Sequence, residues 1–149
     1  MNGNDWTKRY PRIVEEAARL RAPLIIEVVH LSADGVPDFD ALHSRTVDEK
    51  AVALAFDLLL SGDDIRRQPL IERKKALRWV LRKSREGIQY VEHTEGDGRE
   101  MFQAVCKLGL EGIVSKKLNA PYRSGPSKNW IKVKNPKAPA ATRAIEGTF

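Results

Sequence analysis

Two lysines near the end of the chain are the residues best suited by type and spacing to do chemistry. The segment 130–134 reads WIKVK, and in a β-strand a period of two places Lys132 and Lys134 on one face together with Trp130. Two neighbouring ammonium groups attract an anion such as a phosphate. Lysines on edge strands also prevent aggregation, and this segment taken alone favours that alternative.

Two acidic residues stand among apolar ones. Glu27 lies within the β-branched segment 25–29, where a regular strand would put it on an apolar face. An unpaired buried carboxylate costs several kcal/mol. Glu27 should therefore meet a cation, a hydroxyl or a metal, unless a bulge turns it outward or it is an ordinary surface residue. Glu111 precedes the apolar segment 112–114, at the start of an expected strand, and its role is ambiguous.

An aromatic ring and a basic segment are weaker candidates. Phe56 interrupts an aliphatic run, where an aromatic side chain is more often core than a platform for a base. The segment 66–85 is strongly basic, which usually marks a solvated helix face. The alternative is that it lies along a DNA backbone, with Arg66, Arg73 and Lys74 as candidate contacts.

Composition limits the class of protein. Lys and Arg exceed Asp and Glu by 26 − 20 = 6 in a chain of 149 residues. That excess fits a polyanionic partner, although basic domains without one are common. The lone Cys106 permits no intrachain disulfide, and no CxxC pattern indicates zinc, so we expect a reducing, cytoplasmic location. No apolar run is long enough to cross a bilayer, so no membrane partner is expected. The length predicts one compact domain.

Hydrophobic periodicity and turn residues predict an α+β fold with mixed or antiparallel sheets packed against helices. Pro11 should open a helix that Pro23 closes, and Pro69 should open another. The remaining predicted elements are strands over 24–31, 51–60, 88–93, 112–116 and 130–134, a short helix over 38–44 and a helix over 101–108.

Taken in order, several segments resemble the nucleotidyltransferase motifs of ATP-dependent DNA ligases, especially the bacterial ligases of end-joining repair. The segment FDLL at 56–59 is similar to motif IIIa, GLEGIVSK at 109–116 to motif IV, and SKNWIKVK at 127–134 to motif V. Segments 2–11, 35–39 with 42–45, 64–66 and 69–74 also follow the family pattern. The resemblance covers nearly the whole chain.

This resemblance implies an adenylation domain of the covalent nucleotidyltransferase (ATP-grasp-like) type, with ATP and Mg²⁺ or Mn²⁺ as cofactors. Glu27 would contact the ribose or the metal, and Phe56 would stack on adenine. Glu111 would hold the metal, while Lys132 and Lys134 would grip the α-phosphate. The implied partners are nicked or broken double-stranded DNA and end-joining repair proteins, on the bacterial nucleoid.

The sequence departs from the family pattern in three ways. Family enzymes attack ATP with the lysine of a Lys-x-Asp-Gly motif, and no such tetrapeptide occurs in the 149 residues. Ile25 and Ile26 precede Glu27 where the family has Asp-Gly. We therefore expect residues 1–135 to be a partial adenylation domain that lacks the motif I segment. Residues 136–149 would be a linker toward an absent OB-fold domain, and the chain alone would be inactive.

Two alternatives stay open. The chain could be a non-catalytic relic or accessory domain that binds nucleotide or DNA. It could also be another covalent nucleotidyltransferase, such as an RNA ligase or capping enzyme, although motif IIIa and the segment after motif III favour a DNA ligase.

Overall fold

The computed structural model describes residues 4–33, 35, 37–38, 41–42, 44 and 48–138. The chain divides into two compact units, Met1–Glu92 and His93–Phe149. The length of the sequence had predicted one compact domain. Each unit combines helix and sheet, so the predicted α+β class is confirmed. The predicted helix over 38–44 falls largely outside the described residues, as does most of the predicted linker.

The first unit begins with helix α1, Pro11–Leu20, at the position that the sequence predicts. Pro11 occupies the first turn, where its missing N–H leaves no intrahelical bond unmade. Ile13 is buried in the core. The helix ends at Arg21, whose φ of 51° is left-handed and whose backbone N–H donates to the carbonyl of Ala17.

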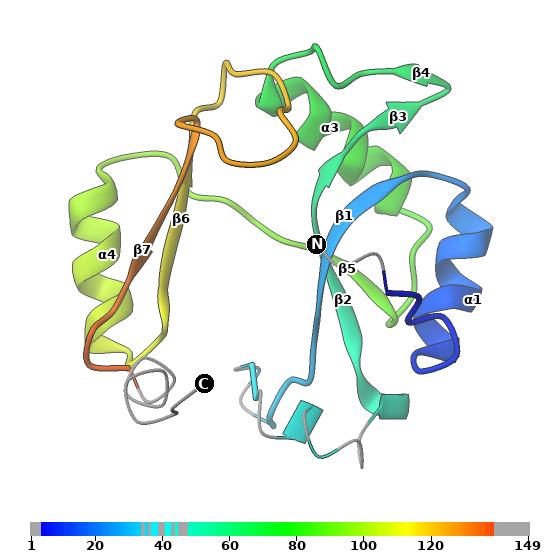
Figure 1. The fold of residues 1–149 in the computed structure, drawn as a ribbon, viewed down its shortest axis with the longest axis horizontal. Coiled ribbons are helices and arrows are strands. Elements are labelled where there is room, and N and C mark those ends of the chain that lie inside the picture. The colour runs from blue at the N-terminus through cyan, green and yellow to red at the C-terminus, as the bar shows by residue number, and fades with distance from the viewer. Residues whose placement is uncertain are drawn as a thin grey trace. The chain divides into compact units, whose positions relative to one another are not determined.

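A three-stranded mixed sheet follows, in the order β1-β2-β5 (Figure 1). Strand β1 is Leu24–Val29, β2 is Val52–Leu58 and β5 is Ile88–Tyr90. β2 pairs with β1 antiparallel and with β5 parallel. The strand predicted over residues 51–60 therefore forms as β2 over residues 52–58, in the centre of this sheet.

Helix α3, Leu70–Leu81, packs against β2 and β5. Its buried apolar residues Leu77 and Leu81 meet Ala53 and Ala55, which are fully buried on β2. The short pair β3, Leu60–Ser61, and β4, Asp63–Asp64, precedes α3. A further short element is the 3-10 turn η1, Asp48–Lys50, before β2.

A buried ion pair ties α3 to β2. Nε and Nη2 of Arg73 each donate to one carboxylate oxygen of Asp57 at 2.9 Å, and both side chains are fully buried. Asp57 also accepts from the backbone N–H of Leu58, while Nη1 of Arg73 donates to the carbonyl of Gln68 at 2.6 Å. The fork geometry and these added hydrogen bonds satisfy both charges inside the unit.

A second buried carboxylate, that of Glu16, joins α1 to the loop after α3. It accepts hydrogen bonds from the hydroxyl of Ser84 at 2.6 Å and from the backbone N–H groups of Arg85 and Ile88. Burial raises the pKa of Glu16, but these hydrogen bonds outweigh it, so the pKa lies below its ordinary value. Gly87 leaves the room that this carboxylate occupies, because a Cβ there would lie 2.5 Å from its Oε2 atom.

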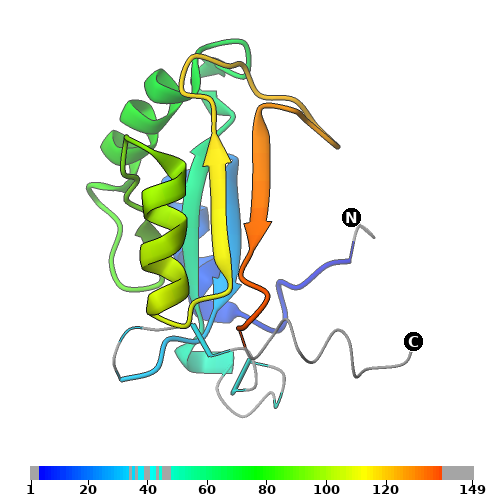
Figure 2. The same cartoon turned by 90° about the vertical axis from the view of Figure 1, so that its left-hand side faces the viewer.

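The described part of the second unit is one helix on a two-stranded sheet. Helix α4, Gly98–Lys107, is capped by Asp97, which accepts from the backbone N–H of Arg99 at 2.7 Å. It packs against β6, Gly112–Lys116, which pairs antiparallel with β7, Trp130–Lys134 (Figure 2). Both strands have the bounds that the sequence predicts.

We expect Asp57→Asn to destabilise the protein by about 3–5 kcal/mol, because it leaves the Arg73 guanidinium buried without its counter-ion. Asp64→Asn is the matched control: Asp64 accepts the same kind of fork from Arg66, but both side chains are about half exposed. Water screens that exposed pair, so its loss should cost far less stability than loss of the buried pair. Urea denaturation followed by circular dichroism measures both, and similar losses in the two variants would contradict the prediction.

Candidate nucleotide site

Glu27 and Phe56 lie on one face of the first unit's sheet. Glu27 pairs with Leu54 on β2, and directly opposed residues of antiparallel strands share a face. Phe56 follows Leu54 by two residues and shares that face as well. The sheet therefore brings a carboxylate and an aromatic ring together as diagonal neighbours.

A bulge in β2 lies at Phe56. Ile25 pairs with Asp57 while Ile26 pairs with Ala55, so the register steps over Phe56. A bulge bends its strand and re-aims a side chain, and bulges are frequent beside functional sites. Phe56 is half-buried, and Ala55 and Asp57 on either side of it are fully buried. The ring of Phe56 is thus directed away from the face that α3 covers.

Glu27 is exposed, so the predicted cost of burying its carboxylate does not arise. Among the residues that the structure describes, its side chain makes no hydrogen bond or ion pair. An exposed carboxylate on a rigid strand can serve as a ligand for a hydroxyl or a metal.

Lys132 and Lys134 share one face of the second unit's sheet, as predicted. They pair with Val114 and Gly112, and both lysines are exposed. Residues two apart on a strand lie about 7 Å from each other. The two ammonium groups can therefore reach a single anion between them.

Glu111 lies at the same end of this sheet as Lys134. Its carbonyl accepts from the backbone N–H of Asn135 at 2.7 Å, which extends the pairing of Gly112 with Lys134 by one step. Gly112 has a φ of +145°, and a Cβ there would lie 2.0 Å from the carbonyl oxygen of Val133. Only glycine allows β6 to start so close to β7, and this holds Glu111 in place.

Asn135 is a structural residue of this site that the sequence did not reveal. It is almost fully buried. Its Nδ2 donates to the carbonyl of Leu110 at 2.9 Å, and its Oδ1 accepts from the backbone N–H of Lys137. Asn135 thereby fixes the backbone beside Glu111. Its position directly after the strand and before Pro136 was the available signal.

At the end of the β6–β7 pair away from Glu111, aromatic contacts join the two strands and the loop between them. Lys116 places its ammonium 3.9 Å from the ring centroid of Trp130. The ring of Tyr122 meets Trp130 edge-on, with centroids 6.3 Å apart. These contacts tie the loop between β6 and β7 to the strands and leave Lys132 and Lys134 as the lysines nearest Glu111 along β7.

The predicted site residues thus form two sets, Glu27 with Phe56 in the first unit and Glu111 with Lys132 and Lys134 in the second. The described residues contain no cluster of three or more His, Cys, Asp or Glu side chains that could hold a metal. A metal bound by either Glu27 or Glu111 would need phosphate oxygens and water to complete its shell, which is the usual situation for Mg²⁺.

Arg73 and Lys74, predicted as DNA contacts, are both buried in this structure. Arg73 is fully buried against Asp57. Lys74 is 5% exposed and donates to the carbonyl of Val91, with its ammonium 4.7 Å from the ring centroid of Tyr90. Burial lowers the pKa of Lys74. Arg73 therefore neutralises Asp57, and Lys74 packs against Tyr90 and Val91, all within the first unit.

Arg66 is exposed, so its role as a DNA contact stays a prediction. Its guanidinium donates a forked pair of hydrogen bonds to Asp64, and these lower the pKa of that carboxyl to about 2.

None of the helices that the structure describes is long and apolar enough to cross a membrane.

The fold is that of a DNA ligase nucleotidyltransferase domain. The family model described as the ATP dependent DNA ligase domain matches residues 2–134. The chain belongs to this family, as its motifs predict.

Relatives with a known role include end-joining proteins. The chain is 36% identical over 141 residues to the multifunctional non-homologous end joining protein LigD of Pseudomonas aeruginosa, with 89% of this chain and 17% of the relative covered. It is 33% identical over 140 residues to the SPbeta prophage-derived DNA ligase-like protein LigB of Bacillus subtilis, with 90% and 52% covered.

Solved structures of DNA ligases also match this chain. The crystal structure of the ligase domain from M. tuberculosis LigD matches with a TM-score of 0.76 and 30% identity, over 89% of this chain and 45% of that one. A mycobacterial DNA ligase D complexed with ATP and MES matches with the same TM-score, identity and coverage. The chain thus spans about half or less of the length of these proteins.

We expect Gly112→Ala to destabilise the second unit by at least about 2 kcal/mol, because the new Cβ collides with the backbone of β7. Gly98→Ala is the control, since a Cβ at that helical position meets nothing within 4 Å and alanine favours the helix. Amide hydrogen exchange in β6 and β7 measures the effect. Equal protection of these strands in both variants would show that the close approach is unimportant.

Proposed function

We propose that this chain provides the adenine-, metal- and phosphate-binding residues of an ATP-dependent DNA ligase that seals breaks through an enzyme–AMP intermediate. The observation that carries the proposal is the family match over residues 2–134, which includes all five predicted site residues. The substrate would be nicked or broken double-stranded DNA.

In the first unit, the ring of Phe56 would stack on adenine and Glu27 would contact the ribose or the metal. Their common face of the β1–β2 pair supports this assignment. A half-buried ring on a strand keeps one face for a base while its other contacts hold it still. Glu27 is exposed on the same face, within reach of a group attached to that base.

In the second unit, Lys132 and Lys134 would bind the α-phosphate, where negative charge increases as pyrophosphate leaves. Fixed ammonium groups stabilise that charge more in the transition state than in the ground state. Glu111 would help to hold Mg²⁺ or Mn²⁺. A bound divalent ion would neutralise charge on the phosphates.

The nucleophile of the family reaction is not among these residues. A lysine amine forms the phosphoramidate only when it is deprotonated and aligned with the α-phosphate. No lysine of the 149 residues stands in a Lys-x-Asp-Gly motif. We propose that the lysine is supplied by residues outside this sequence, so that the 149-residue chain does not adenylate itself.

Incubation with ATP labelled at the α-phosphate, in the presence of magnesium, tests this directly. We expect no label on the chain alone, and label transfer when a peptide carrying a family Lys-x-Asp-Gly segment is added. A labelled band without the peptide would overturn the assignment of the nucleophile. Salt-sensitive DNA binding with no ATP binding would instead favour a non-catalytic accessory domain.

We expect Lys132→Ala and Lys134→Ala each to weaken ATP binding by roughly tenfold or more, because each removes a charged hydrogen bond to phosphate. Lys107→Ala, at the exposed end of α4, is the control for loss of one positive charge. Isothermal titration with ATP and magnesium measures the affinities. A loss in Lys107→Ala as large as in the β7 variants would indicate a general charge effect and not a phosphate site.

A further inference from the structure

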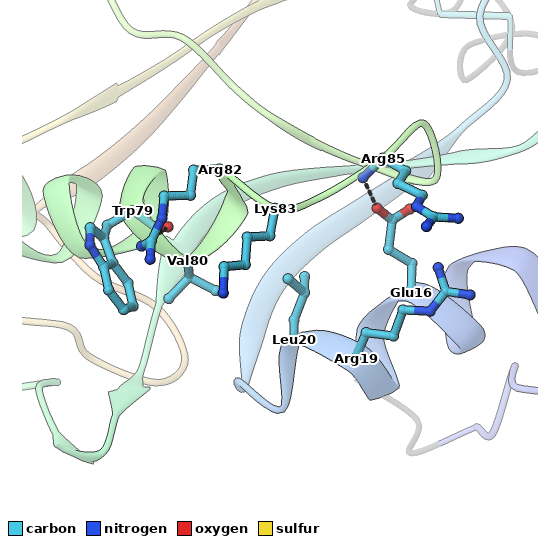
Figure 3. Close-up of a pocket in the computed structure, with 8 residues that line it drawn as sticks. All are labelled: Glu16, Arg19, Leu20, Trp79, Val80, Arg82, Lys83 and Arg85. Atoms are coloured by element: carbon cyan, nitrogen blue, oxygen red, sulfur yellow. Dashed lines mark hydrogen bonds between the residues drawn. The ribbon is translucent and has the colours of Figure 1, made fainter.

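A pocket with a cationic rim lies in the first unit, between α1 and the C-terminal end of α3. Its volume is about 410 Å³, within the range of roughly 300–1,000 Å³ that is typical of ligand pockets. Figure 3 shows Arg19 and Leu20 reaching it from α1, and Trp79 and Lys83 from α3 and the turn that follows. None of the five residues proposed to bind ATP lines it.

The charge around this pocket is strongly one-sided. Arg19, Arg82, Lys83 and Arg85 line it together with a single carboxylate, Glu16. The oxygens of Glu16 are turned into the loop after α3, where they accept hydrogen bonds from Ser84, Arg85 and Ile88. Figure 3 shows the bond from the backbone N–H of Arg85. Within the part of the chain that the structure describes, the side chains of Lys83 and Arg85 make no hydrogen bond or ion pair. The rim therefore presents cations that favour an anionic ligand.

Trp79 adds a large aromatic surface to these charges. Trp79 is the aromatic residue of α3 and is 63% exposed. The guanidinium of Arg82 lies 3.7 Å from the ring centroid and holds the indole in place. Leu20 and Val80 supply apolar surface beside it. An exposed ring next to unpaired cations is the combination that proteins use to bind single-stranded nucleic acid.

We propose that this pocket binds single-stranded DNA, with a base stacked on Trp79 and backbone phosphates held by Lys83 and Arg85, because Arg19 is already paired with Glu15. A single strand offers both a planar base and a row of phosphates. A duplex keeps its bases stacked inside, and an acidic polypeptide matches the charges without offering a base to the indole. The proposal rests on the proposed function in that its ligand is the DNA of a break, whose unpaired ends are single strands.

The test uses the 149-residue chain and a fluorescent oligothymidylate about ten nucleotides long, a length within the range of known single-strand sites. Trp79→Ala should weaken binding roughly tenfold, whereas Trp79→Phe should keep most of it. Lys83→Glu should weaken binding and reduce the slope of log affinity against log salt by about 0.7 for each phosphate that is no longer neutralised. Lys107→Glu, the same charge change at the end of α4, is the matched control and should have little effect.

Several results would overturn the proposal. One is unchanged binding in Trp79→Ala, and another is an equal loss in Lys83→Glu and Lys107→Glu. Binding of a duplex or of polyglutamate with the same dependence on Trp79 would identify a different occupant. Because Trp79 is exposed, circular dichroism should show unaltered folding in its variants.

ATP binding in these variants separates this proposal from the proposed function. Trp79→Ala and Lys83→Glu should leave the affinity for ATP unchanged, while Lys132→Ala should weaken ATP binding and leave oligothymidylate binding unchanged. Loss of both ligands in every variant would refute the existence of a separate single-strand site.

Discussion

The buried ion pair between Asp57 and Arg73 determines which way β2 faces. A shift of one residue in a strand sends every side chain to the opposite face. Such a shift would expose the Asp57 carboxylate to the wrong side of the sheet and leave the Arg73 guanidinium without it. The pair therefore helps to keep Ala53 and Ala55 under α3 and Phe56 on the other face, beside Glu27. The buried pair of Asp57 and Arg73 thus helps to position Phe56 and Glu27, which are proposed to bind nucleotide at the surface of the same unit.

The second unit places its residues by a different means. No buried ion pair holds the described part of β6 and β7, and close backbone approach at Gly112 and the amide of Asn135 set the geometry. Backbone hydrogen bonds leave the side chains of Lys132, Lys134 and Glu111 exposed, as their proposed contacts with phosphate and metal require. Rigid strands are better suited than loops to this task because their side-chain directions are fixed by the pairing.

Much of this could be predicted from the sequence where the signal was local. The bounds of β6 and β7 follow from period-two alternation between turn residues, and Pro11 and Pro69 mark the starts of α1 and α3 correctly. The common face of Lys132 and Lys134 follows from the same period. The inward direction of Arg73 and Lys74 could not be found this way, because it depends on Asp57 and Val91, which are distant in sequence. The same limit applies to the bulge at Phe56 and to Asn135, whose partners are set by tertiary packing.

The carboxylate of Glu16 also constrains how this sequence can change over evolutionary time. Any side chain at position 87 would enter the space of Oε2 and displace an acceptor on which the turn after α3 depends. A shorter residue at position 16 would vacate that space but leave the turn's N–H groups to find other acceptors. The two positions are 71 residues apart by their numbers, yet a change at one alters the surroundings of the other. Related chains should therefore show correlated substitution at 16 and 87, with the acid and the glycine kept or replaced together.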